Sequence, residues 1–251
     1  MAQDRSDRVP APASRSGEAA PTSSRAEIDA FLAQVRELAP TTAAGERGRL
    51  IFALDATMSR QPTWDTACRL QADMFREAAA IGGLDIQLAY YRGMGECRVS
   101  GWVGQAERLA QLMSAIDCRG GATQIGKILS HTAHETRRHK VQALVFVGDA
   151  MEESLDALSR AAGELGLRSV PAFMFQEGFD PVAEQAFREI ARLTRGAYCR
   201  FDLGAAHELA ALLRAVAAYA AGGMRALADL SARRDAGAVK LIAQLKGAGD
   251  A

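Results

Sequence analysis

Cysteine is scarce in this chain of 251 residues, which contains four. They are widely spaced and form no Cys-x-x-Cys pair; they are Cys68, Cys97, Cys118 and Cys199. The first residues are charged and have no apolar segment behind them, which argues against a secretory signal. We therefore expect reduced thiols and a cytoplasmic protein.

Long hydrophobic runs are also missing, since none approaches the roughly 20 residues that span a bilayer. Neither charge sign is in excess, because Lys plus Arg and Asp plus Glu number 30 each. This balance argues against a nucleic acid or an acidic membrane as the main partner. The remaining composition is that of a globular protein, and the length favours one domain with tails.

Composition divides the chain into four segments. Residues 1–25 are rich in Ala, Pro, Ser and Arg and have no periodicity, so we expect a disordered tail. Residues 26–47 comprise a short amphipathic helix and a linker. Residues 48–222 alternate between strand-like and helix-like patterns, and residues 223–251 form a polar helical tail.

The alternating segment predicts an α/β, Rossmann-like fold with helices on both faces of a mostly parallel central sheet. We expect strands at 50–54, 84–91, 97–102, 141–147, 169–175 and 197–201. We expect helices at 64–81, 105–116, 123–139, 155–165, 182–194 and 206–221. The second and third strands are joined by a short Gly-rich turn, which predicts one antiparallel edge strand.

The first buried strand ends in Asp55-Ala-Thr57-Met-Ser59. In open α/β sheets, ligands bind at the carboxyl ends of parallel strands. This loop offers one carboxylate and two hydroxyls. Oxygen ligands with little charge suit a hard cation such as Mg²⁺ or Mn²⁺.

Two further residues are expected at the same edge. Asp149 closes the next deeply apolar strand, and Thr123 follows Gly120-Gly121 at the predicted start of a helix. The glycines allow the backbone to come close to a ligand. A hydroxyl at a helix start is also an ordinary cap, so capping and metal ligation both stay open for Thr123.

The combination of these three elements resembles the von Willebrand factor A (VWA) domain family and its metal-ion-dependent adhesion site (MIDAS). The first motif of that family is Asp-x-Ser-x-Ser, from which Thr57 departs by one methyl group while it keeps the oxygen. Thr123 matches the second motif and Asp149 the third. The resemblance covers residues 48–222.

The resemblance implies a metal-dependent protein–protein interaction module with no catalytic residues, and a bacterial origin. The cation, Mg²⁺ or Mn²⁺, would be held by hydroxyls and carboxylates, and one position would stay open for an acidic residue of a partner protein. The implied partner class is an AAA+ ATPase or a multi-protein assembly. The implied metal ligands are Asp55, Thr57, Ser59, Thr123 and Asp149.

Two alternatives stay open. A haloacid-dehalogenase-like, Mg²⁺-dependent phosphatase or phosphotransferase also begins with a strand and an aspartate and carries a later Gly-Asp, like Gly148-Asp149. Against it, Thr57 replaces the usual general acid, Thr123 starts a helix, and two more strands follow. The other alternative is a scaffold of the same fold without metal.

Nearby acids and histidines receive weaker interpretations. We expect Glu152 and Glu153 to begin the next helix, where acids favour the positive end of the helix dipole. The same predicted helix carries His131, His134 and His139, and we interpret them as parts of a solvated surface rather than as a zinc site.

Overall fold

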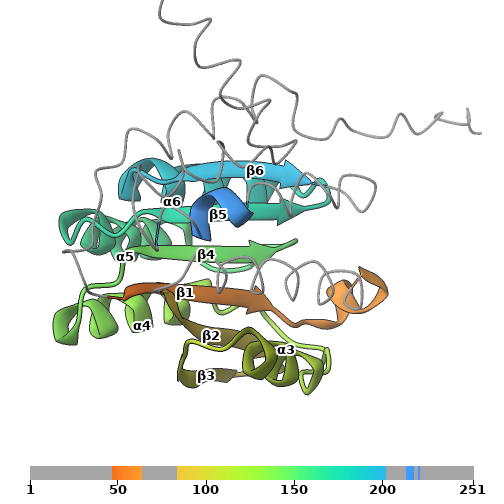
Figure 1. The fold of residues 1–251 in the computed structure, drawn as a ribbon. Helices are drawn as coiled ribbons and strands as arrows, with labels where there is room; N and C mark the ends of the chain where they lie inside the picture. The colour runs from red at the N-terminus through yellow and green to blue at the C-terminus, as the bar shows by residue number, and fades with distance from the viewer. Residues whose placement is uncertain (1–46, 64–83, 202–212, 218–219, 221–251) are drawn as a thin grey trace, which may run out of the picture.

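The computed structural model describes residues 47–63, 84–201, 213–217 and 220. Within them the chain forms one six-stranded sheet in the order β3-β2-β1-β4-β5-β6 (Figure 1). The strands are β1 (Gly48–Asp55), β2 (Leu84–Arg92), β3 (Glu96–Val103), β4 (Ala143–Gly148), β5 (Ala172–Glu177) and β6 (Ala197–Phe201). Neighbouring strands are parallel except for β2 and β3. The predicted sheet with one antiparallel edge strand is therefore confirmed.

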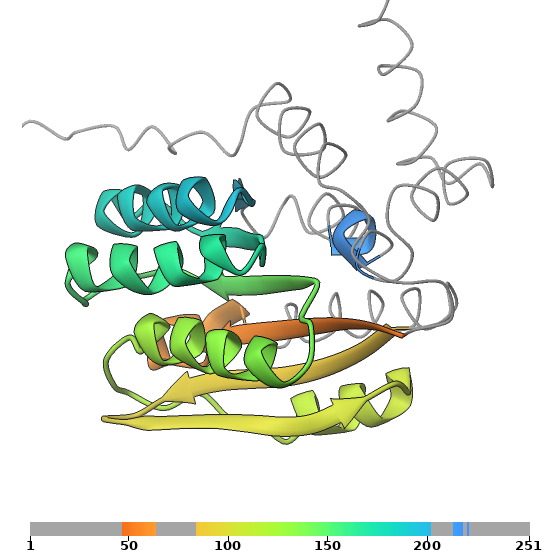
Figure 2. The same cartoon turned by 90° about the vertical axis from the view of Figure 1, so that its left-hand side faces the viewer.

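Helices cover both faces of this sheet. They are the α-helices α3 (Ala106–Ser114), α4 (Ile125–Arg138), α5 (Leu155–Leu167) and α6 (Pro181–Thr194), while the 3₁₀ helix η1 (Met58–Thr63) follows the end of β1. Figure 2 shows α4, α5 and α6 side by side on one face and α3 on the other. In the described part of the chain, no helix has the length and hydropathy that a membrane-spanning segment requires.

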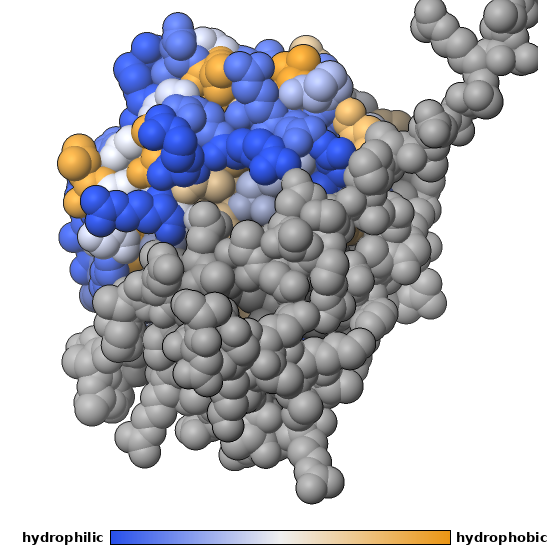
Figure 3. All heavy atoms as spheres, turned by 90° about the horizontal axis from the view of Figure 1, so that it is seen from above, coloured by the Kyte–Doolittle hydropathy of each residue, from blue (hydrophilic) through white to orange (hydrophobic). Residues whose placement is uncertain are grey.

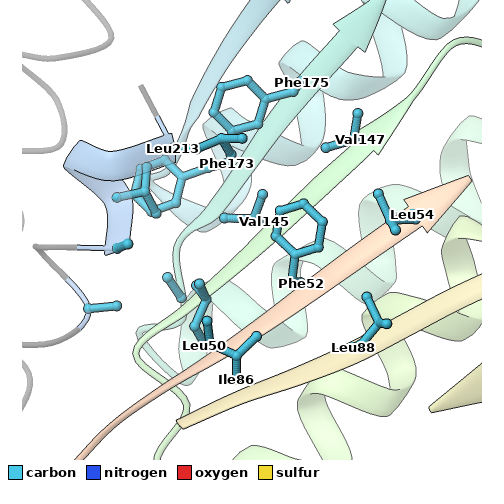
Figure 4. Packing of buried hydrophobic residues seen from close by; sticks show 14 of the residues in the cluster. Leu50, Phe52, Leu54, Ile86, Leu88, Val145, Val147, Phe173, Phe175 and Leu213 are labelled. Carbon is cyan, nitrogen blue, oxygen red and sulfur yellow. The ribbon is translucent and has the colours of Figure 1, made fainter. Parts of the chain in front are cut away.

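The central strands are buried on both sides, as their continuous apolar runs predict. Because side chains alternate along a strand, Leu50, Phe52 and Leu54 pack toward α3 and residues 213–217, whereas Ile51 and Ala53 pack toward α4, α5 and α6. Figure 4 shows the first of these clusters. Each fully buried large side chain contributes about 1.5–3 kcal/mol, so β1 is firmly held where it ends in Asp55.

Some predicted boundaries differ from the structure. The strand expected at 169–175 begins only at Ala172, because the residues before it complete the end of α5. The Ser169 N–H bonds the Gly166 carbonyl, and the φ angle of Ser169 is 53°, in the left-handed region. The helix expected from 206 to 221 is described only at 213–217 and 220, which are helical.

Other predictions fall on residues that the structure does not describe. These are the tail over 1–25, the helix in 26–47, the helix over 64–81 and the tail over 223–251, apart from Arg47. Figure 3 shows the molecule from above the view of Figure 1. Among the described residues on this face, hydrophilic side chains predominate and apolar ones are scattered. This view shows no broad apolar patch in the described part of that face.

Candidate metal site

The candidate site lies where the order of strands along the chain reverses. From β1 the chain adds β2 on one side of the sheet and then β4, β5 and β6 on the other. Asp55 is the last residue of β1, and Asp149 directly follows β4, its parallel neighbour. Both strands point to the same end of the sheet, where η1 also lies (Figure 1). Such a reversal leaves a crevice between diverging loops, which is the usual ligand site of open α/β sheets.

Asp55 is fully buried, and both of its carboxyl oxygens accept hydrogen bonds. The Thr57 N–H donates to Oδ1 at 2.8 Å, and the Tyr91 hydroxyl donates to Oδ2 at 3.0 Å. Burial raises the pKa of the Asp55 carboxyl above its ordinary value, and the nearby charge of Asp149 raises it further. The hydrogen bonds from Thr57 and Tyr91 act in the opposite direction and lower this pKa. A cation beside Asp55 would compensate the charge that burial penalises.

Thr57 and Ser59 place two hydroxyls next to each other. Their Oγ1 and Oγ atoms are 3.1 Å apart, with Thr57 buried and Ser59 exposed. The turn between them is closed by the Arg60 N–H, which donates to the Thr57 carbonyl at 3.1 Å. The local backbone therefore presents the two hydroxyl oxygens together at the end of β1.

Thr123 lies before α4 rather than inside it, so its predicted position in the helix is wrong. The helix begins at Ile125, and its N-cap, Gln124, makes no side-chain capping bond. Thr123 instead forms a reciprocal pair with Glu152: the Glu152 N–H donates to Thr123 Oγ1 at 2.9 Å, and the Thr123 N–H donates to Glu152 Oε2 at 3.0 Å. Capping is therefore not the role of the Thr123 hydroxyl.

Glu153 serves a different helix from the one predicted, and Glu152 bonds Thr123 in the segment before that helix. The Glu153 carboxylate accepts from the N–H groups of Ile125 at 2.5 Å and Gly126 at 2.9 Å, at the start of α4. The following helix, α5, begins at Leu155 and is capped by Ser154. Glu153 does complement a helix dipole, but it reaches across to α4, whose first N–H groups have no partner inside the helix.

Asp149 is half-buried, and its Oδ1 atom is buried with no hydrogen-bond partner in the described part of the chain. Buried polar atoms are almost always bonded, so this oxygen is suited to a ligand. The approach of the loops is close: a Cβ built on Gly148 would lie 3.4 Å from the Asp55 Cβ. Two carboxylates with neutral hydroxyls nearby are a donor set that fits a hard cation.

Hydrogen bonds join the three loops that carry the predicted residues. The Arg119 N–H donates to the Ala56 carbonyl at 3.0 Å, which ties the segment before Thr123 to the end of β1. Within the described ranges, no group of three or more His, Cys, Asp or Glu side chains could hold a metal. A cation here would therefore depend on hydroxyls and water in addition to carboxylates.

Three residues of the site were not predicted from the sequence: Tyr91, Arg60 and Glu177. Tyr91, one residue before the end of β2, pairs in register with Asp55, a signal that strand pairing could have given. Burial, followed by the charge of Asp55, raises the pKa of the Tyr91 hydroxyl well above its ordinary value, so it stays a donor. Arg60 Nη1 lies 2.5 Å from Glu177 Oε2, and its side chain has no exposed surface. Its position in a polar loop gave no sign of this burial.

Comparison with models of known protein families found no match, and neither did comparison with curated proteins. Solved structures do match. A von Willebrand factor type A protein from Catenulispora acidiphila aligns with a TM-score of 0.57 at 17% identity, over 71% of this chain and 44% of that one. The SpRpn10 VWA domain aligns with a TM-score of 0.52 at 13% identity, over 62% and 88%.

An aerotolerance-related membrane protein from Bacteroides fragilis aligns with a TM-score of 0.52 at 16% identity, over 65% of this chain and 96% of that one. At these identities the likeness concerns the fold alone. It agrees with the strand order and the antiparallel edge described above. The chain therefore has a VWA-like α/β fold.

Proposed function

We propose that this chain binds one divalent cation, Mg²⁺ or Mn²⁺, and uses it to bind an acidic residue of a partner protein. The observation that carries the proposal is the pairing of a buried, hydrogen-bonded Asp55 with a nearby Asp149 whose Oδ1 atom has no hydrogen-bond partner among the described residues. The proposed ligands, directly or through water, are Asp55, Thr57, Ser59, Thr123 and Asp149.

The donor set explains why the ion would attract a partner. When bound, the cation supplies positive charge and an open coordination position. Asp55 and Asp149 contribute at most two negative charges, and the hydroxyls contribute none, so attraction for a further carboxylate remains. Thr57 and Tyr91 fix the direction of the Asp55 carboxylate through their hydrogen bonds. Such outer contacts orient metal ligands.

The surroundings of the site favour a protein as the partner. The described residues include six exposed large hydrophobic side chains, and four of these belong to segments at the same end of the sheet: Met58, Met94, Phe179 and Val182. Exposed apolar side chains near a polar centre are typical of protein contacts. The solved structures above give no support for an AAA+ ATPase, which stays a prediction from the family resemblance.

An enzyme of the phosphatase type fits the structure less well. Two strands, β5 and β6, and two helices, α5 and α6, follow Asp149, which is more than that family places there. Thr123 does not end a strand. The metal-free scaffold has more in its favour, because the Thr57–Ser59 and Thr123–Glu152 hydrogen bonds already join the loops without an ion.

Calorimetric titration of chelator-treated protein with Mg²⁺ and Mn²⁺ tests the proposal. We expect binding at about one equivalent, with loss in Asp55→Ala and in Asp149→Ala, because each removes one of the two charged ligands. Asp156→Ala is the matched control. It removes an exposed carboxylate from the first turn of α5 and should leave binding unchanged.

Two outcomes would overturn the proposal. Absence of an ion both in the titration and in crystals soaked at high Mg²⁺ concentration would leave a metal-free scaffold. Turnover of a generic phosphate ester that is abolished by Asp55→Asn would instead assign the site to phosphoryl transfer.

A further inference from the structure

The Arg60–Glu177 ion pair joins two segments that are not neighbours in the sheet. Arg60 directly follows Ser59 in the loop after β1, and Glu177 is the last residue of β5. Since β4 lies between β1 and β5, the pair reaches across the end of β4. Gly148 pairs with Gln176, so Glu177 lies level with Asp149, the residue after β4.

Both members of the pair are withdrawn from water. The Arg60 side chain is 0% exposed and the Glu177 side chain 12%, with 2.5 Å between Nη1 and Oε2. Burial of two charges carries a desolvation cost that their attraction offsets only in a good geometry, and apolar residues of similar volume often stabilise a protein as well or better. Stability alone is therefore a weak reason for an ion pair at this place.

The position of Arg60 in the chain gives a better explanation for a buried ion pair at this place. It lies inside the short η1 helix, one residue after Ser59 and three after Thr57. Its own N–H closes the turn by donating to the Thr57 carbonyl. The guanidinium thus fixes to β5 the turn that carries the Thr57 and Ser59 hydroxyls, which lie 3.1 Å apart.

We propose that Arg60 is a positioning residue of the metal site: its ion pair with Glu177 anchors the turn that carries Thr57 and Ser59 across β4. This inference rests on the proposed function, because it gives the two hydroxyls their role as ligands. Groups outside the ligand shell commonly change metal affinity by about 10–100-fold when they are removed.

The central experiment replaces the pair by apolar residues, Arg60→Met with Glu177→Leu, so that no single charge is left buried. We expect this variant to fold and to bind Mg²⁺ about tenfold more weakly than the native protein. The matched control is Arg137→Met with Glu164→Leu, an exposed ion pair between α4 and α5, which should keep native affinity.

A double-mutant cycle separates positioning from general destabilisation. If Arg60 acts through the turn, then Ser59→Ala should cost less affinity in the pair-replaced protein than in the native protein, by about threefold or more. Additive losses would show that the ion pair does not act through Ser59 and would overturn the inference.

Hydrogen exchange in metal-free protein gives a readout that does not depend on ion binding. The amides to follow are those of Thr57 and Arg60, which donate to Asp55 Oδ1 and to the Thr57 carbonyl. The pair-replaced protein should lose protection at these amides while core amides such as Phe52 keep theirs. Native protection there would overturn the inference.

The two proposals fail separately. If the native protein binds no ion but the turn loses protection in the variant, then the proposed function fails and the anchoring role stands. If the native protein binds Mg²⁺ and the variant binds it equally well, the function stands and the positioning role fails. Should the pair-replaced protein not fold, Glu177→Asp gives the same readouts with a smaller expected loss, because it keeps the charge that compensates Arg60 but shortens the reach of the carboxylate.

Discussion

Tyr91 donates its buried hydroxyl to Oδ2 of Asp55 at 3.0 Å, from the residue directly opposite Asp55 in the parallel pairing of β1 and β2. The bond occupies one lone pair of the carboxylate and fixes its orientation. It is the contact that most directly links the core of the sheet to the candidate site, because the Tyr91 ring also stacks on Phe146 at 6.2 Å.

Tyr91→Phe should therefore destabilise the protein by about 1.5–3 kcal/mol, the range for a hydrogen bond to a charged group. Urea denaturation at neutral pH measures this loss. Tyr198→Phe is the matched control, because it removes a bond to the neutral Gln176 side chain and should cost about 1 kcal/mol. Equal losses in the two variants would contradict a charge-assisted bond at Asp55.

Gly148→Ala should disturb both the core and the site. A Cβ at this position would lie 2.8 Å from the Phe146 ring and 3.4 Å from the Asp55 Cβ, so the ring must shift. We expect a loss of about 1–3 kcal/mol in the free energy of unfolding. Gly163→Ala, in α5, meets nothing within 4 Å and should instead stabilise by about 0.5–1 kcal/mol. Thermal denaturation of both variants checks the opposite signs.

Glu153→Ala should weaken the start of α4. The substitution removes the acceptor of the Ile125 and Gly126 N–H groups, and we expect a loss of about 1–2 kcal/mol. Glu164→Ala, which removes an exposed acid that pairs with Arg168, should cost at most about 0.5 kcal/mol. Denaturant titration distinguishes the two, and a native-like Glu153 variant would mean that water replaces the carboxylate there.

His131 should make stability depend on pH. Burial lowers the pKa of its imidazole, the charge of Glu135 opposes this and that of His134 adds to it. Below about pH 6.5, His131 is protonated in the unfolded chain but still neutral in the folded chain. The free energy of unfolding therefore falls as the pH decreases toward the lowered pKa of the folded state.

His131→Gln should remove this part of the acid-side loss, as measured by denaturation between pH 7 and about pH 5, a range in which histidine titrates. His139→Gln, at the exposed C-terminal end of the same helix, keeps His131 and the neighbours that act on it, and should keep the slope. An unchanged slope in the His131 variant would contradict the assignment. His131 is half-buried and bonds Gln87 at 2.7 Å, so its interpretation as solvated surface is wrong.

The sheet could be predicted because the sequence of each strand by itself indicates a strand. The buried runs that end at Asp55 and Gly148, and the glycine turn between β2 and β3, are periodic signals that tertiary contacts reinforce. The first residue of a strand was less predictable where residues of strand-like composition belong to the preceding turn. Val170 reads as strand, yet its N–H bonds the Leu165 carbonyl at the end of α5.

The loops of the site could be predicted, but their supporting contacts could not. Asp55 and Asp149 close apolar runs, and this places them at one end of the sheet. The partners of Thr123 and Glu153 depend on which loops meet across the sheet, which local sequence does not encode. Arg60 is buried only because Glu177 lies on a strand more than a hundred residues later.

Because of the reversal of strand order, the loops that carry the proposed metal ligands differ from the loops that carry exposed apolar side chains. The proposed metal ligands lie in loops near β1 and β4, whereas Met94 and Phe179 lie in the β2–β3 hairpin and in the loop after β5. Substitutions in the outer loops, the β2–β3 hairpin and the loop after β5, need not change the conformation of the inner loops that follow β1 and β4. Under the proposed function, this chain could therefore change its choice of partner through the outer loops without any change in the five proposed ligands.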